Sequence, residues 1–543
     1  MKKPLFTLTL LALATNQAMA GAYRVEILDQ PSGLYNTEAR VITEDGRIAG
    51  NLSARYEFDG GDDENSTDDD SYQDRLGLIS SDSLKSTADT FGVASFFAAS
   101  YVFVNDPDLQ LIPGFGSDEE GLTVTSTLAD IVGDLVALRS TAPRRTTEFT
   151  DSDGDTQTLV IRDFAQRGLL NDGENQQQAL PSFTWPDTVN GISAEDNLGG
   201  SSAINSLSNT WAVGFGSVSF TEDGQSRFDD CNRENLDTHP LICLETAGLV
   251  NQAHAWPVSN GQLGEPLVLA GLTEPQGDES EDVFISVAHG VNDQGLAVGR
   301  SVGRHDGSLI RLATLFDLNG GSAIEAITPA GNGLLTSTAF DITNSGWVVG
   351  NATFDGTSDL DRFFIYNTDS KELAYPDTFY NGANSVAFAV NEAGLAVGAA
   401  DWEELPPTVQ RRRHAFIYDA IAKTFTDLNE QTVFDASLVS QQYGGDGCAA
   451  REDWTLVEAS DINEAGEIAA TAVTTFRDAN GELVLDDDGN KQYVIRAVRL
   501  VPDANAEAPV CVPEEQEPFK RSGGSLGWGL ALLSLLGLRR RLA

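Results

Sequence analysis

A short pattern of apolar and polar residues recurs along the chain and predicts a series of β-hairpins. In residues 288–299, an apolar strand ends at Val291, Asn292 opens a turn, Gly295 closes it, and a second apolar run follows. An Asn side chain accepts hydrogen bonds within a tight turn, and glycine adopts the left-handed conformation that such a turn needs. The pattern also occupies residues 39–50, 339–350, 387–398 and 459–470, and residues 203–214 keep its ending without the turn glycine.

Three asparagines of this pattern could serve as ligands or as turn residues. Asn292, Asn391 and Asn463 each stand three residues before a glycine, directly after an apolar strand. Because this is the position from which a side chain opens a turn, we interpret all three as turn residues.

A further strand follows each hairpin, and a polar turn then leads to one more. Residues 413–419 illustrate the third strand and residues 423–428 the fourth, with counterparts to the third at 254–256, 312–317, 362–367 and 496–500. Four antiparallel strands in roughly 40 to 50 residues match a propeller blade. The predicted fold class is therefore all-β, a β-propeller of about six or seven four-stranded blades. An open β-solenoid is the competing architecture.

The two ends of the predicted propeller are expected to meet. The last repeat stops near residue 501 without a fourth strand, and residues 23–28 alternate between polar and apolar with no local partner. An unpaired strand edge would expose backbone groups. We therefore predict that residues 23–28 complete the last blade beside residues 496–501.

Residues 55–180 fit the repeat poorly and are interpreted as an insertion or cap subdomain within a body that spans residues 21–501. Leu128, Ile131 and Leu135 follow helical spacing, which predicts a helix over residues 128–138. The fold class thus includes a partly helical insertion near the N-terminus. Because insertions commonly carry function, a specific partner is expected to bind here.

The triplet His414-Ala415-Phe416 provides a family resemblance. It is the motif of the HAF-repeat proteins of bacteria, which the chain resembles over residues 200–501 and 39–50. Together with its two ends, the chain resembles an uncharacterised secreted family, domain of unknown function 3466. The triplet is degenerate in the other copies, so its apolar residues are expected in the core and His414 at a blade edge.

Residues 1–20 have the three parts of a signal peptide. Lys2 and Lys3 precede an apolar run, and small residues lead to a cleavage site between Ala20 and Gly21. Signal peptidase is therefore an expected partner, and the chain is expected to be exported.

Residues 523–543 combine Gly523-Gly524-Ser525, a short apolar run and a terminal arginine cluster. This segment resembles the GlyGly-CTERM sorting signal of Gram-negative bacteria. The resemblance implies a transient inner-membrane anchor through a short C-terminal helix, cleavage near Gly523, Gly524 and Ser525 by a rhombosortase-type protease, and type II secretion to the cell surface or beyond. Residues 502–522 would form an acidic, Pro-rich stalk. A permanent tail anchor is the competing interpretation.

The composition narrows the possible partners. With 82 Asp and Glu against 34 Lys and Arg, the formal charge of −48 excludes nucleic acid, which needs a basic face. The chain has 41% hydrophobic residues, enough for a core. Four cysteines allow three pairings in an oxidising compartment, and we favour Cys231 with Cys243 and Cys448 with Cys511. No Cys-x-x-Cys pair supports zinc.

No motif in the sequence identifies a catalytic or cofactor-binding residue. The chain lacks the common zinc, phosphate-loop and dinucleotide motifs, and its one Gly-x-Ser-x-Gly sequence lies in the sorting segment. Asp151, Asp153 and Asp155 alternate as oxygen ligands for calcium do, which leaves calcium as the one possible cofactor. A plain hairpin turn between two short strands is the favoured alternative.

The sequence leaves two functions open. The favoured one is an extracellular binding or structural module of unknown biochemical activity, with a protein or polysaccharide as partner. The alternative is a secreted hydrolase or lyase that acts on a polymeric substrate through carboxylates on a propeller face. Two close acids beside aromatic residues would favour the enzyme.

Overall fold

The computed structural model describes residues 22–28, 35–56, 96–106 and, with short gaps, 108–511. The chain divides into a compact unit, Met1–Ala508, and a second unit, Pro509–Ala543. The predicted signal peptide and the sorting segment 523–543, with Ala20, Gly21, Gly523, Gly524 and Ser525, lie outside the described residues.

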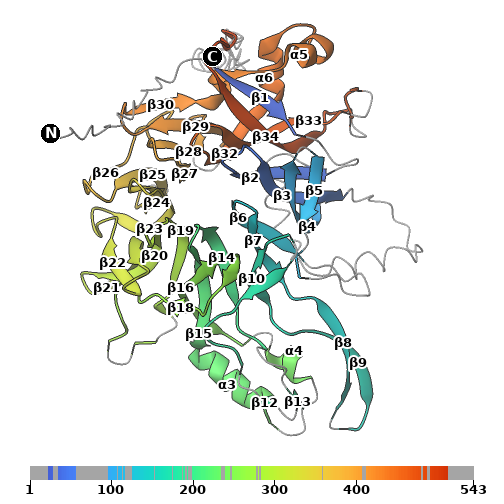
Figure 1. The fold of residues 1–543 in the computed structure, drawn as a ribbon, viewed down its shortest axis with the longest axis vertical. Coiled ribbons are helices and arrows are strands. Elements are labelled where there is room, and N and C mark those ends of the chain that lie inside the picture. The colour runs from blue at the N-terminus through green and yellow to red at the C-terminus, as the bar shows by residue number, and fades with distance from the viewer. Residues whose placement is uncertain are drawn as a thin grey trace, which may run out of the picture. The chain divides into compact units, whose positions relative to one another are not determined.

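Most strands of the compact unit form antiparallel sheets that follow one another along the chain (Figure 1). The first sheet contains β2 (Tyr35–Ile42), β3 (Ile48–Tyr56), β4 (Phe96–Asp106) and β5 (Asp108–Ile112). The second contains β6 (Ser126–Val132), β7 (Leu135–Thr141), β10 (Gln166–Asn171) and β11 (Gln176–Ala179). The third contains β14 (Ser202–Leu207), β15 (Trp211–Phe220) and β16 (Leu249–Ser259), with β17 (Gln262–Leu263) and β18 (Leu267–Val268) on its outer side.

The next strands repeat this order. One group is β19 (Ser286–Val291), β20 (Leu296–His305), β21 (Ser308–Asp317) and β22 (Ser322–Ala326). A single residue pair, Arg311 with Thr336, connects it to β23 (Leu334–Ile342), β24 (Trp347–Phe354), β25 (Leu360–Asn367) and β26 (Leu373–Ala374). The following sheet contains β27 (Ser385–Val390), β28 (Leu395–Asp401), β29 (Arg413–Asp419) and β30 (Thr424–Asp427).

The last sheet combines both ends of the compact unit. It contains β32 (Thr455–Ile462), β33 (Ile468–Thr475), β34 (Tyr493–Asp503), β1 (Ala22–Ile27) and the short β31 (Thr432–Val433). Strand β1 pairs antiparallel with β34, and Val25 lies opposite Leu500. The prediction that residues 23–28 complete the last repeat is confirmed.

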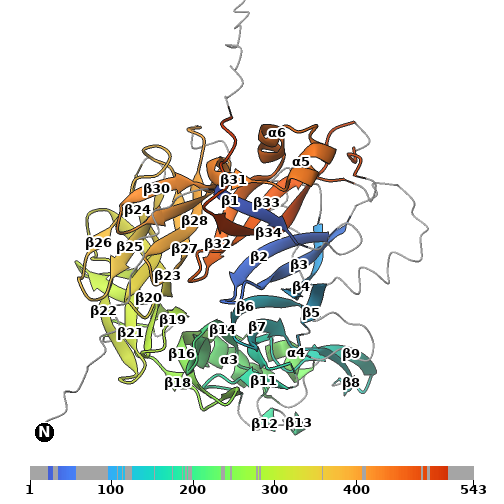
Figure 2. The same cartoon turned by 45° about the horizontal axis from the view of Figure 1, so that its top comes forward.

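The first strand of each sheet packs against the sheet before it. Strand β2 contacts β32, β33 and β34, which joins the last sheet to the first. In the same way, β6 contacts β2 and β3, β14 contacts β6 and β7, and β32 contacts β27, β28 and β29. In Figure 2 the first strands of the sheets surround the middle of the compact unit.

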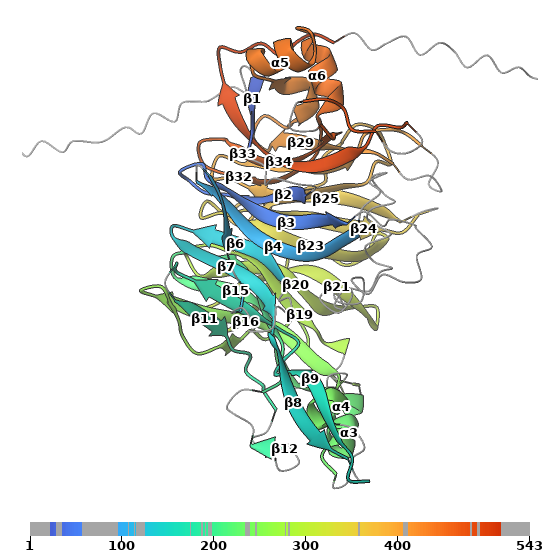
Figure 3. The ribbon, with the colours of Figure 1, turned by 90° about the vertical axis from the view of Figure 1, so that its right-hand side faces the viewer.

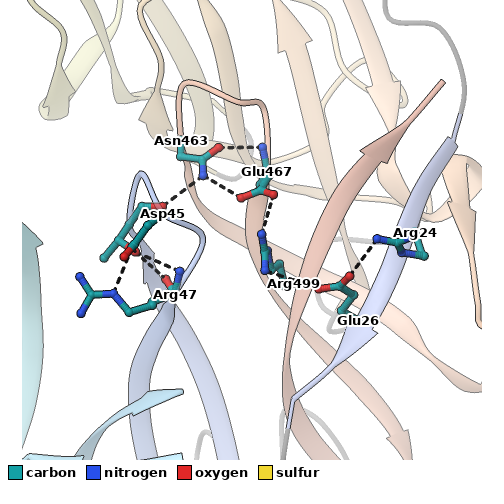
Figure 4. Close-up of polar contacts among 8 residues, drawn as sticks. Arg24, Glu26, Asp45, Arg47, Asn463, Glu467 and Arg499 are labelled. Atoms are coloured by element: carbon teal, nitrogen blue, oxygen red, sulfur yellow. Dashed lines mark hydrogen bonds and ion pairs between the residues drawn. The ribbon is translucent and has the colours of Figure 1, made fainter. Parts of the chain in front are cut away.

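A cluster of polar side chains connects the last sheet to the first (Figure 4). Arg499 of β34 forms ion pairs with Glu26 of β1 at 3.6 Å and with Glu467 at 2.6 Å. Asn463 then donates one hydrogen bond to Glu467 and another to the carbonyl oxygen of Thr43, at 2.9 and 3.1 Å. The cluster therefore connects β1, the β32–β33 turn and the β2–β3 turn.

The predicted helix over residues 128–138 is wrong. These residues form the hairpin β6–β7, and Leu128 lies opposite Leu138. The buried positions of two strands, interrupted by a tight turn at Gly133, imitate helical spacing. The described part of residues 96–179 contains no helix. Its strands complete the first sheet, build the second and form a separate hairpin between residues 144 and 162. This predicted helix is the part of the expected insertion that is wrong, and the insertion at residues 55–180 stays a prediction.

Among the described residues, helices occur elsewhere: α3 (Glu222–Cys231), α4 (Pro240–Leu244), α5 (Ala436–Gln442), α6 (Gly447–Asp453) and the 3₁₀ turn η2 (Leu428–Gln431). Helices α3 and α4 belong to a peripheral module with the hairpins β8 (Arg144–Thr150)–β9 (Thr156–Arg162) and β12 (Thr188–Val189)–β13 (Ile192–Ser193), seen at the lower end of Figure 3.

The peripheral module has its own small core and a disulfide bond. Trp185, Phe228 and Leu241 pack together there. The bond joins Cys231 to Cys243, with the Cα atoms 5.7 Å apart, and confirms that predicted pairing. Cys448 and Cys511 are also disulfide-bonded. Disulfides of this kind fit an oxidising environment.

The expected localisation, with a transient inner-membrane anchor through the C-terminal helix, is corrected. Within the described parts of the chain, none of the helices has the length and apolar character needed to cross a membrane.

Candidate binding surface on the first strands

Each hairpin that opens a sheet has one extra residue in its first strand. The pairing registers of β2, β6, β14, β19, β23, β27 and β32 all skip one residue at the same place in the repeat. A bulge of this kind leaves the extra residue unpaired and redirects its side chain. We call the seven extra residues the axial surface: Arg40, Ala129, Asn205, His289, Phe340, Phe388 and Ser460.

The axial surface differs from the neighbouring positions of the repeat in its exposure to solvent. Every one of the seven residues is exposed or half-buried. The residue before each of them is buried in every copy, as Ala288 is before His289 and Ala339 before Phe340. The repeat therefore presents one accessible side chain per hairpin above a closely packed strand.

Side chains of the axial surface contact one another across successive sheets. The ring centres of His289 and Phe340 lie 5.6 Å apart, and those of Phe340 and Phe388 lie 6.2 Å apart. These three residues come from β19, β23 and β27. They form an aromatic sector of the axial surface.

A charged sector lies on β2 and β32. Arg40 forms ion pairs with Glu38 at 3.1 Å and with Glu458 at 3.4 Å. Burial raises the pKa of the Glu458 carboxyl group above its usual range, while Arg40 opposes that shift. Burial alone would lower the pKa of Arg40, but Glu458 and Glu38 raise it.

Two more arginines border the axial surface from the second strands of their sheets. Arg139 of β7 donates a hydrogen bond to the side-chain oxygen of Asn205. Arg300 of β20 lies opposite Val287, close to His289 in the pairing register. Burial lowers the pKa of both guanidinium groups. Burial, together with Arg300 and Arg139, also lowers the pKa of His289 to about 3, so its imidazole is neutral at pH 7.

Three half-buried carboxylates support the bulges. Asp341 accepts the backbone N–H groups of Ile342 and of Val390 in the next sheet, at 2.8 and 2.9 Å. Asp130 and Asp461 make the same pair of contacts with their own and the following first strand. These carboxylates satisfy backbone groups that the bulges leave unpaired, so we assign them a structural role.

The turn asparagines are confirmed as turn residues. The Asn292 side-chain oxygen accepts the N–H groups of Gln294 and Leu296, at 3.1 and 3.0 Å. Its Nδ2 also donates to the carbonyl oxygen of Thr343 in the next repeat, at 3.0 Å. Asn391 and Asn463 likewise donate to the following turn. The asparagines therefore hold neighbouring hairpins together as well as shaping their own turns.

The three aspartates predicted as possible calcium ligands lie in the turn that connects β8 to β9. The Asp151 carboxylate accepts the N–H groups of Asp153 and Asp155 at 3.0 and 2.9 Å, as a plain turn requires. Around these aspartates, the described side chains form no cluster of three metal-ligating groups. Calcium binding by Asp151, Asp153 and Asp155 stays a prediction.

His414, the histidine of the His-Ala-Phe triplet, contacts a carboxylate and an aromatic ring. His414 Nδ1 lies 2.8 Å from the Asp427 carboxylate on the neighbouring strand β30, and its ring stacks on Trp402 at 4.4 Å. Ala415 and Phe416 are fully buried, as expected for core positions.

The sequence interpretation missed the axial surface. It placed the expected partner site in residues 55–180, from which Ala129 alone belongs to the axial surface. One signal could have revealed the surface: His289, Phe340, Phe388, Ser460 and Arg40 stand at one repeat position and differ in chemistry, whereas their neighbours recur. The Asp-Ile pair shared by 130–131, 341–342 and 461–462 would also have identified the missed hairpin.

These features define the chain as a propeller-like repeat protein with a non-repeating surface on its first strands. The chain belongs to the family described as protein of unknown function DUF3466, whose model matches residues 2–541. None of the curated proteins matches the chain.

Solved structures similar to the chain have low identity. One is an oligogalacturonate lyase from Vibrio parahaemolyticus, 11% identical, with a TM-score of 0.37, covering 88% of this chain and 97% of its own. A protein of unknown function from Dyadobacter fermentans is 10% identical, with a TM-score of 0.32 and coverages of 70% and 94%. The β-propeller domain of the trilobed protease from Pyrococcus furiosus is 10% identical, with a TM-score of 0.29 and coverages of 76% and 97%.

Proposed function

We propose that this chain is a binding module built as a closed, seven-bladed β-propeller whose axial surface contacts the ligand. Seven bulged hairpins, one per blade, support this blade number. The pairing of β1 with β34 and the contacts of β2 with the last sheet support closure.

One observation carries the assignment of function to the axial surface. Buried and turn positions of the repeat keep similar residues, such as alanine before the bulge and glycine in the turn. The accessible bulge position carries a cation, a small residue, an amide, an imidazole, two phenyl rings and a hydroxyl. A repeated scaffold needs similar residues at its buried and turn positions. Recognition of one ligand needs different side chains at different places on the surface.

A glycan and protein binding array with the full chain tests this proposal. For any ligand found, Phe340→Ala should weaken binding by about tenfold or more, since truncation of a central aromatic contact commonly costs that much. The control Trp402→Ala removes an aromatic side chain that is 40% exposed but lies outside the axial surface. Equal effects of the two variants on every ligand would contradict the proposal.

A hydrolase or lyase activity on a polymeric substrate is the second candidate. Glu38 and Glu458 are held on one surface by Arg40, and burial raises the pKa of Glu458. Two carboxyl groups in unequal environments are the usual acid–base pair of glycoside cleavage. Glu458→Gln should then abolish turnover and retain binding. A wild-type chain that binds a polymer and leaves it intact would exclude this candidate.

A further inference from the structure

Arg139 and Arg300 have no carboxylate partner among the described residues. Arg139 has only the neutral side chain of Asn205 as its hydrogen-bond acceptor. Arg300 has no hydrogen bond or ion pair to any described residue, and its Nε is buried without a partner. After burial, another arginine lowers the pKa of each further, Arg40 for Arg139 and Arg311 for Arg300.

Half-buried arginines that lack a carboxylate partner among the described residues are unusual in so acidic a chain. Acidic residues outnumber Lys and Arg by 82 to 34, so carboxylates are plentiful. Other half-buried arginines have one, such as Arg411 with Asp401 at 3.2 Å and Arg499 with Glu467 at 2.6 Å. Removing a cation from water without a counter-charge is unfavourable. Two such cations beside one accessible surface indicate an anion supplied from outside the chain.

The surroundings specify the kind of anion. Arg139 donates a hydrogen bond to Asn205, whose Nδ2 donates to the carbonyl oxygen of Ala288 at 2.7 Å, and Arg300 lies opposite Val287. Both arginines are therefore tied to the segment 287–289 that carries His289. The ring of Phe340 lies 5.6 Å from that imidazole. A guanidinium group matches a carboxylate with two parallel hydrogen bonds, and an aromatic face packs against a flat or cyclic group.

Building on the proposed function, we propose that Arg139 and Arg300 bind the carboxylate of a ligand whose ring packs against Phe340. An acidic sugar and an aromatic acid share this chemistry.

Calorimetric titration of the full chain tests the inference and separates these two sources. The probes are a uronate oligosaccharide and benzoate, and their neutral counterparts are the carboxyl-reduced oligosaccharide and benzyl alcohol. At least one carboxylate should bind about tenfold more tightly than its counterpart, and Arg139→Gln and Arg300→Gln should each remove about that much. Arg412→Gln, the control, makes the same charge change at a side chain that is 70% exposed and paired with Glu403.

Thermal melting without ligand distinguishes binding from structural support. Because Arg300 has no partner to lose, Arg300→Gln should leave the melting temperature unchanged or raise it. A structural arginine would lower the melting temperature when replaced.

The inference is overturned if neither carboxylate binds at millimolar concentration, or if the neutral counterparts bind equally well and the arginine variants behave as the wild type. If Phe340→Ala still weakens binding of a neutral ligand in that case, the proposed function survives without the anionic ligand. If no ligand depends on Phe340, the proposed function itself fails.

Discussion

At the scale of single residues, glycine ends five of the seven bulged hairpins and packs directly against the backbone of the facing strand. Ala470 and Leu138 stand at this place in the other two hairpins. A Cβ atom on Gly299 would lie 2.0 Å from the carbonyl oxygen of Val287, and one on Gly350 would lie 2.1 Å from that of Thr338. Such contacts do not occur in real structures, so the backbone would have to shift. The turn glycine has a different reason: Gly295 has a φ of +81°.

Gly299→Ala should lower the free energy of unfolding by about 2 kcal/mol or more, because the clash is with backbone. Gly264→Ala is the matched control, since its Cβ would meet only the Pro257 side chain at an ordinary 3.4 Å. Denaturant unfolding measures both variants. Equal stability of the two would contradict the bulge geometry.

The half-buried carboxylate of Asp341 should make stability depend on pH. Burial raises its pKa from 3.8 to about 6, so the folded chain holds this proton more tightly than the unfolded chain. Its stabilising effect is therefore complete below about pH 4 and is lost as the pH rises through about 6. The stability advantage of the wild type over Asp341→Asn should fall by up to about 3 kcal/mol across this range.

Unfolding of both proteins at a series of pH values measures this difference. Replacement of the exposed Asp369 by Asn removes a carboxyl group from the surface and is the control. A difference for Asp341→Asn that stays constant with pH would show that burial does not govern this carboxyl group.

At the scale of elements, the sequence predicts hairpins well where turn chemistry is explicit. The copies with Asn or Thr before a turn glycine all form the expected strands, such as β19–β20 and β27–β28. The hairpin β6–β7 was missed because its turn is shorter, with Gly133 and Asp134 replacing the longer Asn-containing turn. In the copy at 203–214, Ile204 rather than Ala203 faces Gly214, because the lost turn residue shortens the hairpin.

The axial surface could not be predicted from residue types. Its members include apolar phenyl rings that sequence reasoning assigns to a core, and only the bulge in the first strand turns them toward solvent. That Arg139 and Arg300 have no carboxylate partner within the described residues likewise depends on which acids the fold brings near them, and composition does not contain this information.

The β1 strand should be an integral part of the last sheet. Val25 is 5% exposed and packs with Leu456, Val498 and Leu500, whereas the Arg24 side chain is 50% exposed. Val25→Asp should therefore cost at least about 3 kcal/mol of unfolding free energy, because it buries an unpaired charge. Arg24→Asp should cost less than about 1 kcal/mol. Similar small losses for both would mean that β1 does not complete the last sheet.

At the scale of the whole molecule, the recurring residues of the repeat stabilise the fold, whereas the axial surface is proposed to bind the ligand. Buried alanines, bulge-supporting aspartates and turn asparagines join each hairpin to the next, and the Arg499 cluster joins the last repeat to the first. The net charge of −48 describes the chain as a whole, yet two arginines without a carboxylate partner among the described residues border the axial surface. The net charge of the chain therefore does not describe the ligand proposed for this surface.

A crystal structure of the full chain with the uronate oligosaccharide or benzoate bound would show where the ligand lies. We expect its carboxylate within hydrogen-bond distance of Arg139 or Arg300 and its ring against Phe340. A ligand bound elsewhere on the chain, with the axial surface holding only water, would contradict this expectation.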